Sequence, residues 1–266
     1  MVNVDGFFYH PTRKVYTTPE ELGVDCESVG FTSGDGTRLA GLFIPGYPPA
    51  TGTVLHLHGN AGNVTAHLGN VAWLPALGWN VLCFDYRGYG RSEGWPSRDG
   101  TLADAHAALD YLLNRPDVDA RRVVAFGESL GGAISIVLAA QRQEIRGLAT
   151  DGAFSHYRRI ARWTLRQNPL LLVLGWWVPK WLMVDGLDPI DHVARIGPRP
   201  VLFMHGSADR IVPLRMAEEL HAAAGDPKEL WIMEGMDHYQ ALHELPGEVH
   251  PRLDGFFRRC VSEATC

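Results

Sequence analysis

The turn inside residues 123–132, V-V-A-F-G-E-S-L-G-G, constrains this chain more than any other feature. The apolar residues that open it predict a buried strand, and residues 133–140 favour a helix, so the backbone must turn sharply between them. Ser129 lies at the pivot in the pattern G-x-S-x-G, where Gly127 and Gly131 remove side chains that would collide. A glycine-rich turn that merely packs closely would not need a polar serine at its tip. We therefore expect the Ser129 hydroxyl to stand clear of the edge of a sheet.

Strand-like and helix-like segments alternate along most of the 266-residue chain, which is long enough for one large domain. The strand-like runs are continuous in apolar residues, which is typical of a mostly parallel sheet covered by helices on both faces. The expected fold class is therefore α/β. The predicted strands are residues 28–32 and 39–44, which form a hairpin, and residues 53–57, 79–84, 123–126, 147–150, 200–205 and 229–233. Helices are expected over residues 102–113 and 214–224, and residues 64–77 permit a helix.

The alternation stops between residues 154 and 195, where large apolar residues and arginines accumulate. We interpret this segment as a lid inserted over the strand ends, which divides the core domain into residues 1–153 and 196–266. A transmembrane helix is the competing interpretation, but the apolar run is shorter than the roughly 20 residues that a bilayer needs, and Pro179 and Lys180 interrupt it. A hairpin on a membrane surface stays open as a less favoured alternative, because the segment combines tryptophans with arginines.

The composition argues against several classes of partner. A net charge of −6 gives no basic face for nucleic acid, so we expect no nucleic-acid partner. The cysteines form neither a C-x-x-C pair nor a metal-binding spacing, and no metal site is expected. The N-terminus lacks the basic and apolar regions of a signal peptide, which favours a reduced, cytoplasmic location. No feature of the sequence indicates an oligomeric state.

A serine hydroxyl becomes a nucleophile only when a neighbouring base takes its proton. Serine turns of this kind are followed along the chain by an acid and then by a histidine. Asp209 lies in a small-residue turn after the predicted strand at 200–205, where a carboxylate would orient an imidazole. It could instead cap the next helix, and Asp151, after the preceding strand, is the alternative acid. His238 lies in the loop after the last predicted strand and is the predicted base.

The negative oxygen that forms during acyl transfer needs N–H donors near Ser129. A helix begins with free N–H groups, so the main-chain N–H of Leu130 is the first predicted donor. The turn H-G-N-A-G-N at residues 58–63 supplies the second, which we assign to the main-chain N–H of Asn60, with Ala61 as the alternative. In the next loop, Asp85 and Arg87 are interpreted as an internal ion pair.

Six short motifs are spread along the chain from about residue 27 to the C-terminus. They are F-T-S-G-D-G at residues 31–36, H-G-N-A-G-N at 58–63, F-D-Y-R-G-Y-G at 84–90, G-E-S-L-G-G at 127–132, H-G-S-A-D at 205–209 and D-H at 237–238. Together they resemble the α/β-hydrolase superfamily, and within it the lidded serine hydrolases often named alpha/beta-hydrolase-domain proteins. The resemblance implies an α/β-hydrolase fold, with a mostly parallel eight-stranded sheet flanked by helices and a small helical lid. It also implies ester or thioester hydrolysis without metal or cofactor.

The predicted substrate is a small-molecule carboxylic ester or thioester with a short-to-medium acyl chain. The lid carries more apolar surface than a connecting loop requires, so we expect it to cover the acyl side of the site, with Trp177 and Trp181 contacting substrate. A serine aminopeptidase or acylaminoacyl-type peptidase is the alternative enzyme, although the lid shows no pocket for a charged terminus. A non-catalytic binding protein on a hydrolase scaffold is disfavoured, because Ser129, Asp209 and His238 are all present.

Overall fold

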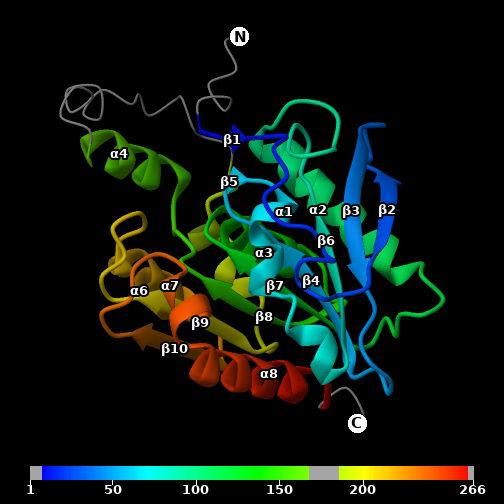
Figure 1. The fold of residues 1–266 in the computed structure, drawn as a ribbon. Helices are drawn as coiled ribbons and strands as arrows, with labels where there is room; N and C mark the ends of the chain where they lie inside the picture. The colour runs from blue at the N-terminus through cyan, green and yellow to red at the C-terminus, as the bar shows by residue number, and fades with distance from the viewer. Residues whose placement is uncertain (1–7, 168–185, 263–266) are drawn as a thin grey trace.

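An eight-stranded sheet forms the centre of the computed structural model, which describes residues 8–167 and 186–262 of the chain (Figure 1). The strand order is β10-β9-β8-β7-β4-β6-β3-β2. The strands are β2 (Glu27–Thr32), β3 (Arg38–Ile44), β4 (Gly52–Leu57), β6 (Trp79–Phe84), β7 (Val123–Glu128), β8 (Ile145–Asp151), β9 (Val201–Gly206) and β10 (Lys228–Met233). Each strand predicted from the sequence is present, with its ends shifted by two residues at most.

The sheet is mostly parallel, as predicted. Within it only β3 runs against its neighbours, β2 and β6, and all other neighbouring strands are parallel. The strands β4, β6, β7 and β9 are buried at every residue, which explains their continuous apolar sequences. Parallel strands end at one edge of a sheet, so the loops after β4, β7, β8, β9 and β10 all begin there. This edge collects the predicted site residues.

Helices cover both faces of the sheet and form two apolar cores. One core contains residues of α2 (Arg98–Leu113), α3 (Leu130–Gln141) and α6 (Leu214–Ala223). The other contains residues of α1 (Val64–His67), α7 (Gln240–Glu244) and α8 (Pro246–Ser262). In Figure 1, α8 lies along one side of the sheet, and α2 and α3 lie toward the other. The α/β fold class is therefore confirmed.

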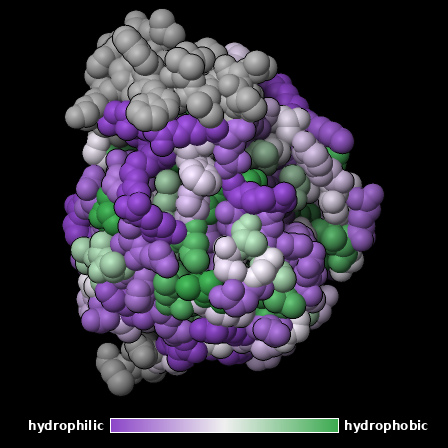
Figure 2. All heavy atoms as spheres, turned by 90° about the vertical axis from the view of Figure 1, so that its left-hand side faces the viewer, coloured by the Kyte–Doolittle hydropathy of each residue, from purple (hydrophilic) through white to green (hydrophobic). Residues whose placement is uncertain are grey.

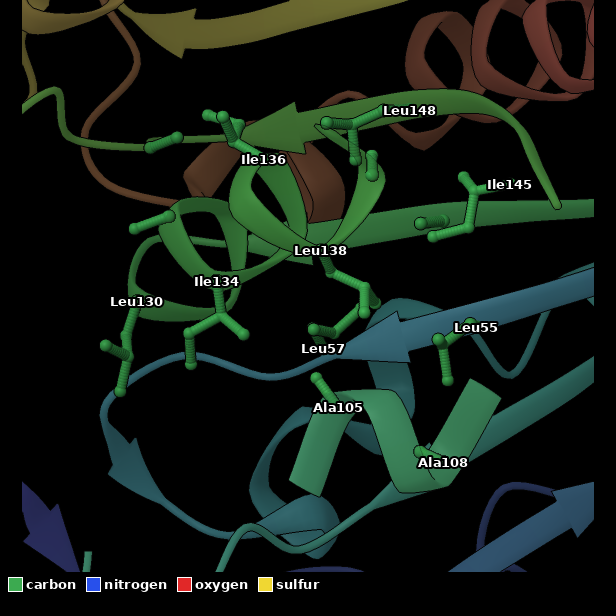
Figure 3. Packing of buried hydrophobic residues seen from close by; sticks show 14 of the residues in the cluster. Leu55, Leu57, Ala105, Ala108, Leu130, Ile134, Ile136, Leu138, Ile145 and Leu148 are labelled. Atoms are coloured by element: carbon green, nitrogen blue, oxygen red, sulfur yellow. The ribbon is translucent and has the colours of Figure 1, made fainter. Parts of the chain in front are cut away.

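The helix α3 is anchored along one side by packing against β4 and α2. Leu130, Ile134 and Leu138 of α3 point toward Leu57 of β4 and Ala105 of α2, and all five are at most 2% exposed (Figure 3). Complete burial of a leucine or isoleucine side chain contributes about 1.5–3 kcal/mol to folding. Leu130 is therefore held by its side chain, and its main-chain N–H, next to Ser129, has a defined direction.

The segment that follows β4 differs from a single helix. Asn63 caps the short α1, and the chain then forms the 3₁₀ helices η2 (Leu68–Asn70) and η3 (Leu74–Leu77). Gly69 and Pro75 are poor residues for a helix interior, which accounts for the interruption. The turn before α1 forms the two-residue strand β5 (Ala61–Gly62), which pairs with β1 (His10–Pro11). The sequence had given no sign of this pairing.

The ion pair expected between Asp85 and Arg87 is wrong. Arg87 instead binds Asp104 and Asp35, with nitrogen–oxygen distances of 2.8 and 2.7 Å. Asp85 accepts hydrogen bonds from the main-chain N–H groups of Val64 and of Arg91, at 2.8 and 3.1 Å. Each side chain therefore still holds a loop, but through different partners.

Part of the predicted lid segment is described. It contains α4 (Tyr157–Gln167) and the 3₁₀ helices η5 (Pro189–Asp191) and η6 (Val193–Arg195). Trp177 and Trp181 lie outside the described residues, so the division into core and lid stays a prediction. On the side of the molecule that carries α4, α6 and β10, hydrophilic residues predominate and apolar residues show in patches between them (Figure 2). Within residues 8–167 and 186–262, no helix is both long and apolar enough to cross a membrane.

Candidate active site

Ser129 occupies the sharp turn between β7 and α3. Its backbone has φ of 49° and ψ of −107°, and among the described residues only Ser129 and Tyr239 combine a side chain with a positive φ. Such a conformation costs on the order of 1–3 kcal/mol and persists only where the surroundings enforce it. Here the Ser129 N–H donates to the carbonyl oxygen of Asp151 at 2.8 Å, which ties the turn to the end of β8.

Gly131 allows the start of α3 to approach β4 closely. A Cβ atom at this position would lie 1.9 Å from the carbonyl oxygen of Leu57 and 2.6 Å from that of His58. A larger residue would push the helix away from the turn that contains Asn60. The glycine in the G-x-S-x-G pattern therefore serves the spacing between the two predicted N–H donors.

His238 and Asp209 meet at the sheet edge, although 29 residues separate them. Nδ1 of His238 lies 2.6 Å from Oδ2 of Asp209, and both side chains are largely buried, at 8% and 1% exposure. The ring of His238 rests on Gly152, where a Cβ atom would lie 2.7 Å from its Cε1. Because Gly152 follows Asp151, which holds the Ser129 N–H, the imidazole lies beside the serine turn.

The Asp209 carboxylate is held from several sides. Its Oδ1 accepts the main-chain N–H groups of Ile211 and Val212, both at 2.8 Å. Its Oδ2 also lies 3.3 Å from Nε2 of His205, in addition to the contact with His238. These donors orient the carboxylate, so that Oδ2 faces the imidazole.

Asp237, the sequence neighbour of His238, has a different task. Its Oδ1 accepts the main-chain N–H of Arg210 at 3.0 Å and that of His238 at 2.9 Å, and its carboxylate also pairs with the Arg210 guanidinium. These hydrogen bonds lower the pKa of Asp237 to about 2. The residue thus fastens the loop of the acid to the loop of the base.

Asp151, the alternative acid, points elsewhere. Its side chain is buried, and its Oδ2 has no hydrogen-bond partner within the described residues. Burial, with repulsion from Glu128 and Asp209, raises the pKa of Asp151 well above its ordinary value. A carboxyl group in this state is a poor partner for an imidazolium, and the geometry favours Asp209 as the partner of His238.

The turn that carries Asn60 is anchored by the Asn60 side chain. Its Nδ2 donates to the carbonyl oxygen of Phe8 at 2.6 Å, and its Oδ1 accepts from the His10 N–H at 3.0 Å and from the Tyr89 hydroxyl at 2.7 Å. The side chain is thus engaged, and only main-chain N–H groups of this turn remain as candidate donors. Leu130 supplies the other candidate, the first N–H of α3.

Comparison with known proteins gives matches along most of the chain. The sequence profile described as alpha/beta hydrolase fold matches residues 52–172. The uncharacterised protein YfhR of Escherichia coli K12 is 37% identical over 250 residues, which cover 92% of this chain and 83% of YfhR. This chain belongs to the α/β-hydrolase family.

Two further matches agree with this assignment. The alpha/beta hydrolase domain-containing protein WAV2 of Arabidopsis thaliana is 36% identical to this α/β hydrolase over 220 residues, covering 78% of this chain and 69% of WAV2. The structure of the Pyrococcus furiosus esterase Pf2001 superposes with a TM-score of 0.80 at 23% identity, covering 94% of this chain and 97% of that one. At this identity the esterase shows a shared fold. The family supports a hydrolase in general terms.

Tyr239 is a site residue of this α/β hydrolase that the sequence interpretation missed. Its ring lies against the His238 ring, with centres 3.9 Å apart. Its buried hydroxyl lies beside Ser129 and Gly59, without a hydrogen bond of normal geometry. Burial and the nearby Glu128 charge raise the pKa of the phenol well above its ordinary value, so it remains neutral. The aromatic residue after the predicted base was the available signal.

Glu128 was also missed, because it was taken only as the variable position before Ser129. Its side chain is wholly buried and contacts His56, His67 and Asn70. The signal was an acidic residue at the end of an apolar strand, since an ionised carboxylate is almost never buried without partners. In residues 8–167 and 186–262, no group of three or more His, Cys, Asp or Glu side chains is arranged to hold a metal ion.

Proposed function

We propose that this α/β hydrolase is a serine esterase, which cleaves carboxylic esters or thioesters of short-to-medium acyl chains. The observation that carries the proposal is the His238–Asp209 pair, with a 2.6 Å contact, beside a serine in a strained backbone conformation. An oriented imidazole next to an exposed hydroxyl is the arrangement that activates serine for acyl transfer.

The reaction proceeds in two halves. The Ser129 oxygen attacks the carbonyl carbon while Nε2 of His238 takes the hydroxyl proton, and Asp209 stabilises the imidazolium that results. The tetrahedral intermediate collapses, the imidazolium protonates the leaving alcohol or thiol, and an acyl group remains on Ser129. His238 then removes a proton from water, which attacks the acyl-enzyme and releases the acid.

The intermediate's oxygen is stabilised by main-chain N–H groups. The N–H of Leu130 stands at the positive end of α3, beside the attacking oxygen. The N–H of Asn60, with Ala61 as its alternative, completes the hole from the turn after β4. Donors of this kind contribute most when they are fixed before the reaction, and the buried side chain of Leu130 and the bonded side chain of Asn60 support that condition.

The substrate class follows from the predicted lid. A lid at residues 154–195, inserted between core segments 1–153 and 196–266, would cover the acyl side of Ser129. Trp177 and Trp181 would then contact the acyl chain, and each buried methylene contributes about 0.8 kcal/mol. We therefore propose a small-molecule ester or thioester as substrate and a cytoplasmic location.

The test compares two serine variants of the same helix region. Ser129→Ala should lower ester turnover by on the order of 10⁶, because the nucleophile is lost. Ser135→Ala is the matched control, since Ser135 is buried in α3 and its hydroxyl donates to the Gly132 carbonyl oxygen. A fluorophosphonate should label the wild type and the control in equal amounts and leave Ser129→Ala unlabelled. Equal labelling of all three proteins would contradict the assignment of Ser129.

A further inference from the structure

Glu128 places a carboxylate in the buried layer directly before Ser129. Three donors surround it: Nε2 of His56 at 2.9 Å, Nδ1 of His67 at 2.6 Å and Nδ2 of Asn70 at 2.9 Å. Burial alone would raise the pKa of Glu128, but the histidine charges and hydrogen bonds outweigh it and lower the pKa well below its ordinary value. The neighbour of the nucleophile is therefore a buried anion.

His67 faces an acceptor at each nitrogen of its ring. Nδ1 contacts Oε2 of Glu128, and Nε2 lies 3.0 Å from the carbonyl oxygen of Ala61. A neutral imidazole carries one proton, so only the imidazolium can donate to both acceptors. Burial by itself would lower the pKa of His67, but the Glu128 charge and the two hydrogen bonds raise it above the ordinary value of 6.5. His67 and Glu128 thus form a buried ion pair.

The other groups that face His67 leave it as the cation of the cluster. The ring of His58, on β4, lies 5.5 Å from that of His67, and burial followed by repulsion from His67 lowers the pKa of His58 well below its ordinary value. His56, also on β4, contacts the other oxygen of Glu128. Tyr239 presents its ring to His67 at 6.2 Å, and burial keeps its phenol neutral.

The ion pair connects the two turns that carry the predicted N–H donors. Glu128 is bonded to the turn of Ser129 and Leu130, and the Ala61 carbonyl belongs to the turn of Asn60. We propose that His67 is a positioning residue, whose Nε2–H holds the Ala61 carbonyl so that this turn presents its N–H to the oxygen of the tetrahedral intermediate. The inference rests on the proposed function, because acyl transfer is the reaction that needs such a hole.

The charge on His67 is part of this role. If the ring lost its proton, one nitrogen would present a lone pair to either Glu128 or the Ala61 carbonyl oxygen. A bond to the proton would become a repulsion between two acceptors, and the turn would move away from Ser129. The position of the N–H donor therefore depends on keeping the imidazolium.

Two substitutions at position 67 separate the two contacts of the ring. The amide nitrogen of asparagine comes near the position of Nδ1, so His67→Asn keeps a donor for Glu128 and loses the contact with Ala61. The longer glutamine places its amide nitrogen near Nε2, so His67→Gln keeps a donor for Ala61. We expect His67→Asn to lower kcat by roughly 10- to 100-fold with KM changed less than threefold, and His67→Gln to stay within about fivefold of the wild type.

A purely structural role predicts the opposite order, because the buried Glu128 charge would then matter most. Equal losses in both variants, or a larger loss in His67→Gln, would overturn the proposal. His56→Gln is the matched control, since it removes another imidazole from Glu128 without touching the Ala61 turn. It should lower kcat less than His67→Asn does.

A measurement on the wild type does not depend on how the variants fold. In isotope-labelled protein at pH 7.5, NMR should show both ring nitrogens of His67 protonated, and deprotonation should occur only on raising the pH further. A bare nitrogen at pH 7.5 would overturn the proposal. If the wild type neither hydrolyses esters nor reacts with a fluorophosphonate, the proposed function fails. If it does both and the asparagine and glutamine variants behave alike, only the role of His67 fails.

Discussion

Two histidine–carboxylate pairs flank Ser129, and they have the same contact distance. His238 meets Asp209 at 2.6 Å on one side, and His67 meets Glu128 at 2.6 Å on the other. The pairs differ at the second ring nitrogen. Nε2 of His67 is bonded to the Ala61 carbonyl oxygen, whereas no group in the described part of the chain holds Nε2 of His238.

This difference separates a pair that can exchange a proton from one that holds it. A ring with one free nitrogen accepts a proton from a hydroxyl, and its carboxylate partner stabilises the charged form. A ring with both nitrogens bonded to acceptors keeps its protons and acts as a fixed cation. The same two residue types therefore serve reaction on one side of Ser129 and positioning on the other.

The largest expected effect is on the exchanging pair. Asp209→Asn should lower kcat by roughly 10⁴, because the amide favours the wrong tautomer of His238, while the melting temperature changes little. Asp151→Asn is the matched control and should stay within a few-fold of the wild type. If the control loses activity and Asp209→Asn keeps it, the acid is Asp151 and the comparison fails.

On the fixed pair, the main effect should be on stability. Glu128→Gln leaves the buried His67 without its counter-ion, and removing one partner of a buried ion pair costs about 3–5 kcal/mol. Urea denaturation should show this loss, and the same measurement on Asp209→Asn should show a much smaller one. Equal losses would mean that both pairs serve the fold to the same degree.

Tyr239 contacts both histidines, so it tests how far the two pairs are independent. Tyr239→Phe removes a buried hydroxyl that lacks a partner, so the free energy of unfolding should stay the same or rise slightly. We expect kcat to fall about three- to tenfold, because the hydroxyl lies beside Ser129. An unchanged kcat would show that the tyrosine only packs between the rings.

The smallest expected effect concerns the predicted lid, which should affect substrate preference and neither pair. Trp177→Ala or Trp181→Ala should reduce the preference for butyrate and hexanoate esters over acetate by roughly three- to tenfold. Rates on p-nitrophenyl esters of the three acids measure it. Equal losses on all three esters would mean that the tryptophans do not contact the acyl chain.

The sequence by itself determined the sheet and the turn of the nucleophile. Apolar runs specify buried strands locally, and residues 79–84 were predicted with the bounds that β6 has in the structure. The turn before α3 was also readable, because a strand, two glycines, a serine and a helix follow one another without a gap. Chain order then suggested Asp209 and His238 as partners. These signals lie within a few residues or depend on the order of the loops along one edge.

Only the tertiary structure decided which side chains meet. His238 could have faced Asp209 or Asp151, and the strand order and loop conformations bring Nδ1 to Asp209. His67 and Glu128 are 61 residues apart, and no periodicity relates them. Their contact exists because β4 and β7 are neighbours in the sheet and α1 follows the turn that closes over their ends. Pairing of buried charges depends on packing between distant segments, and a local sequence pattern carries no record of it.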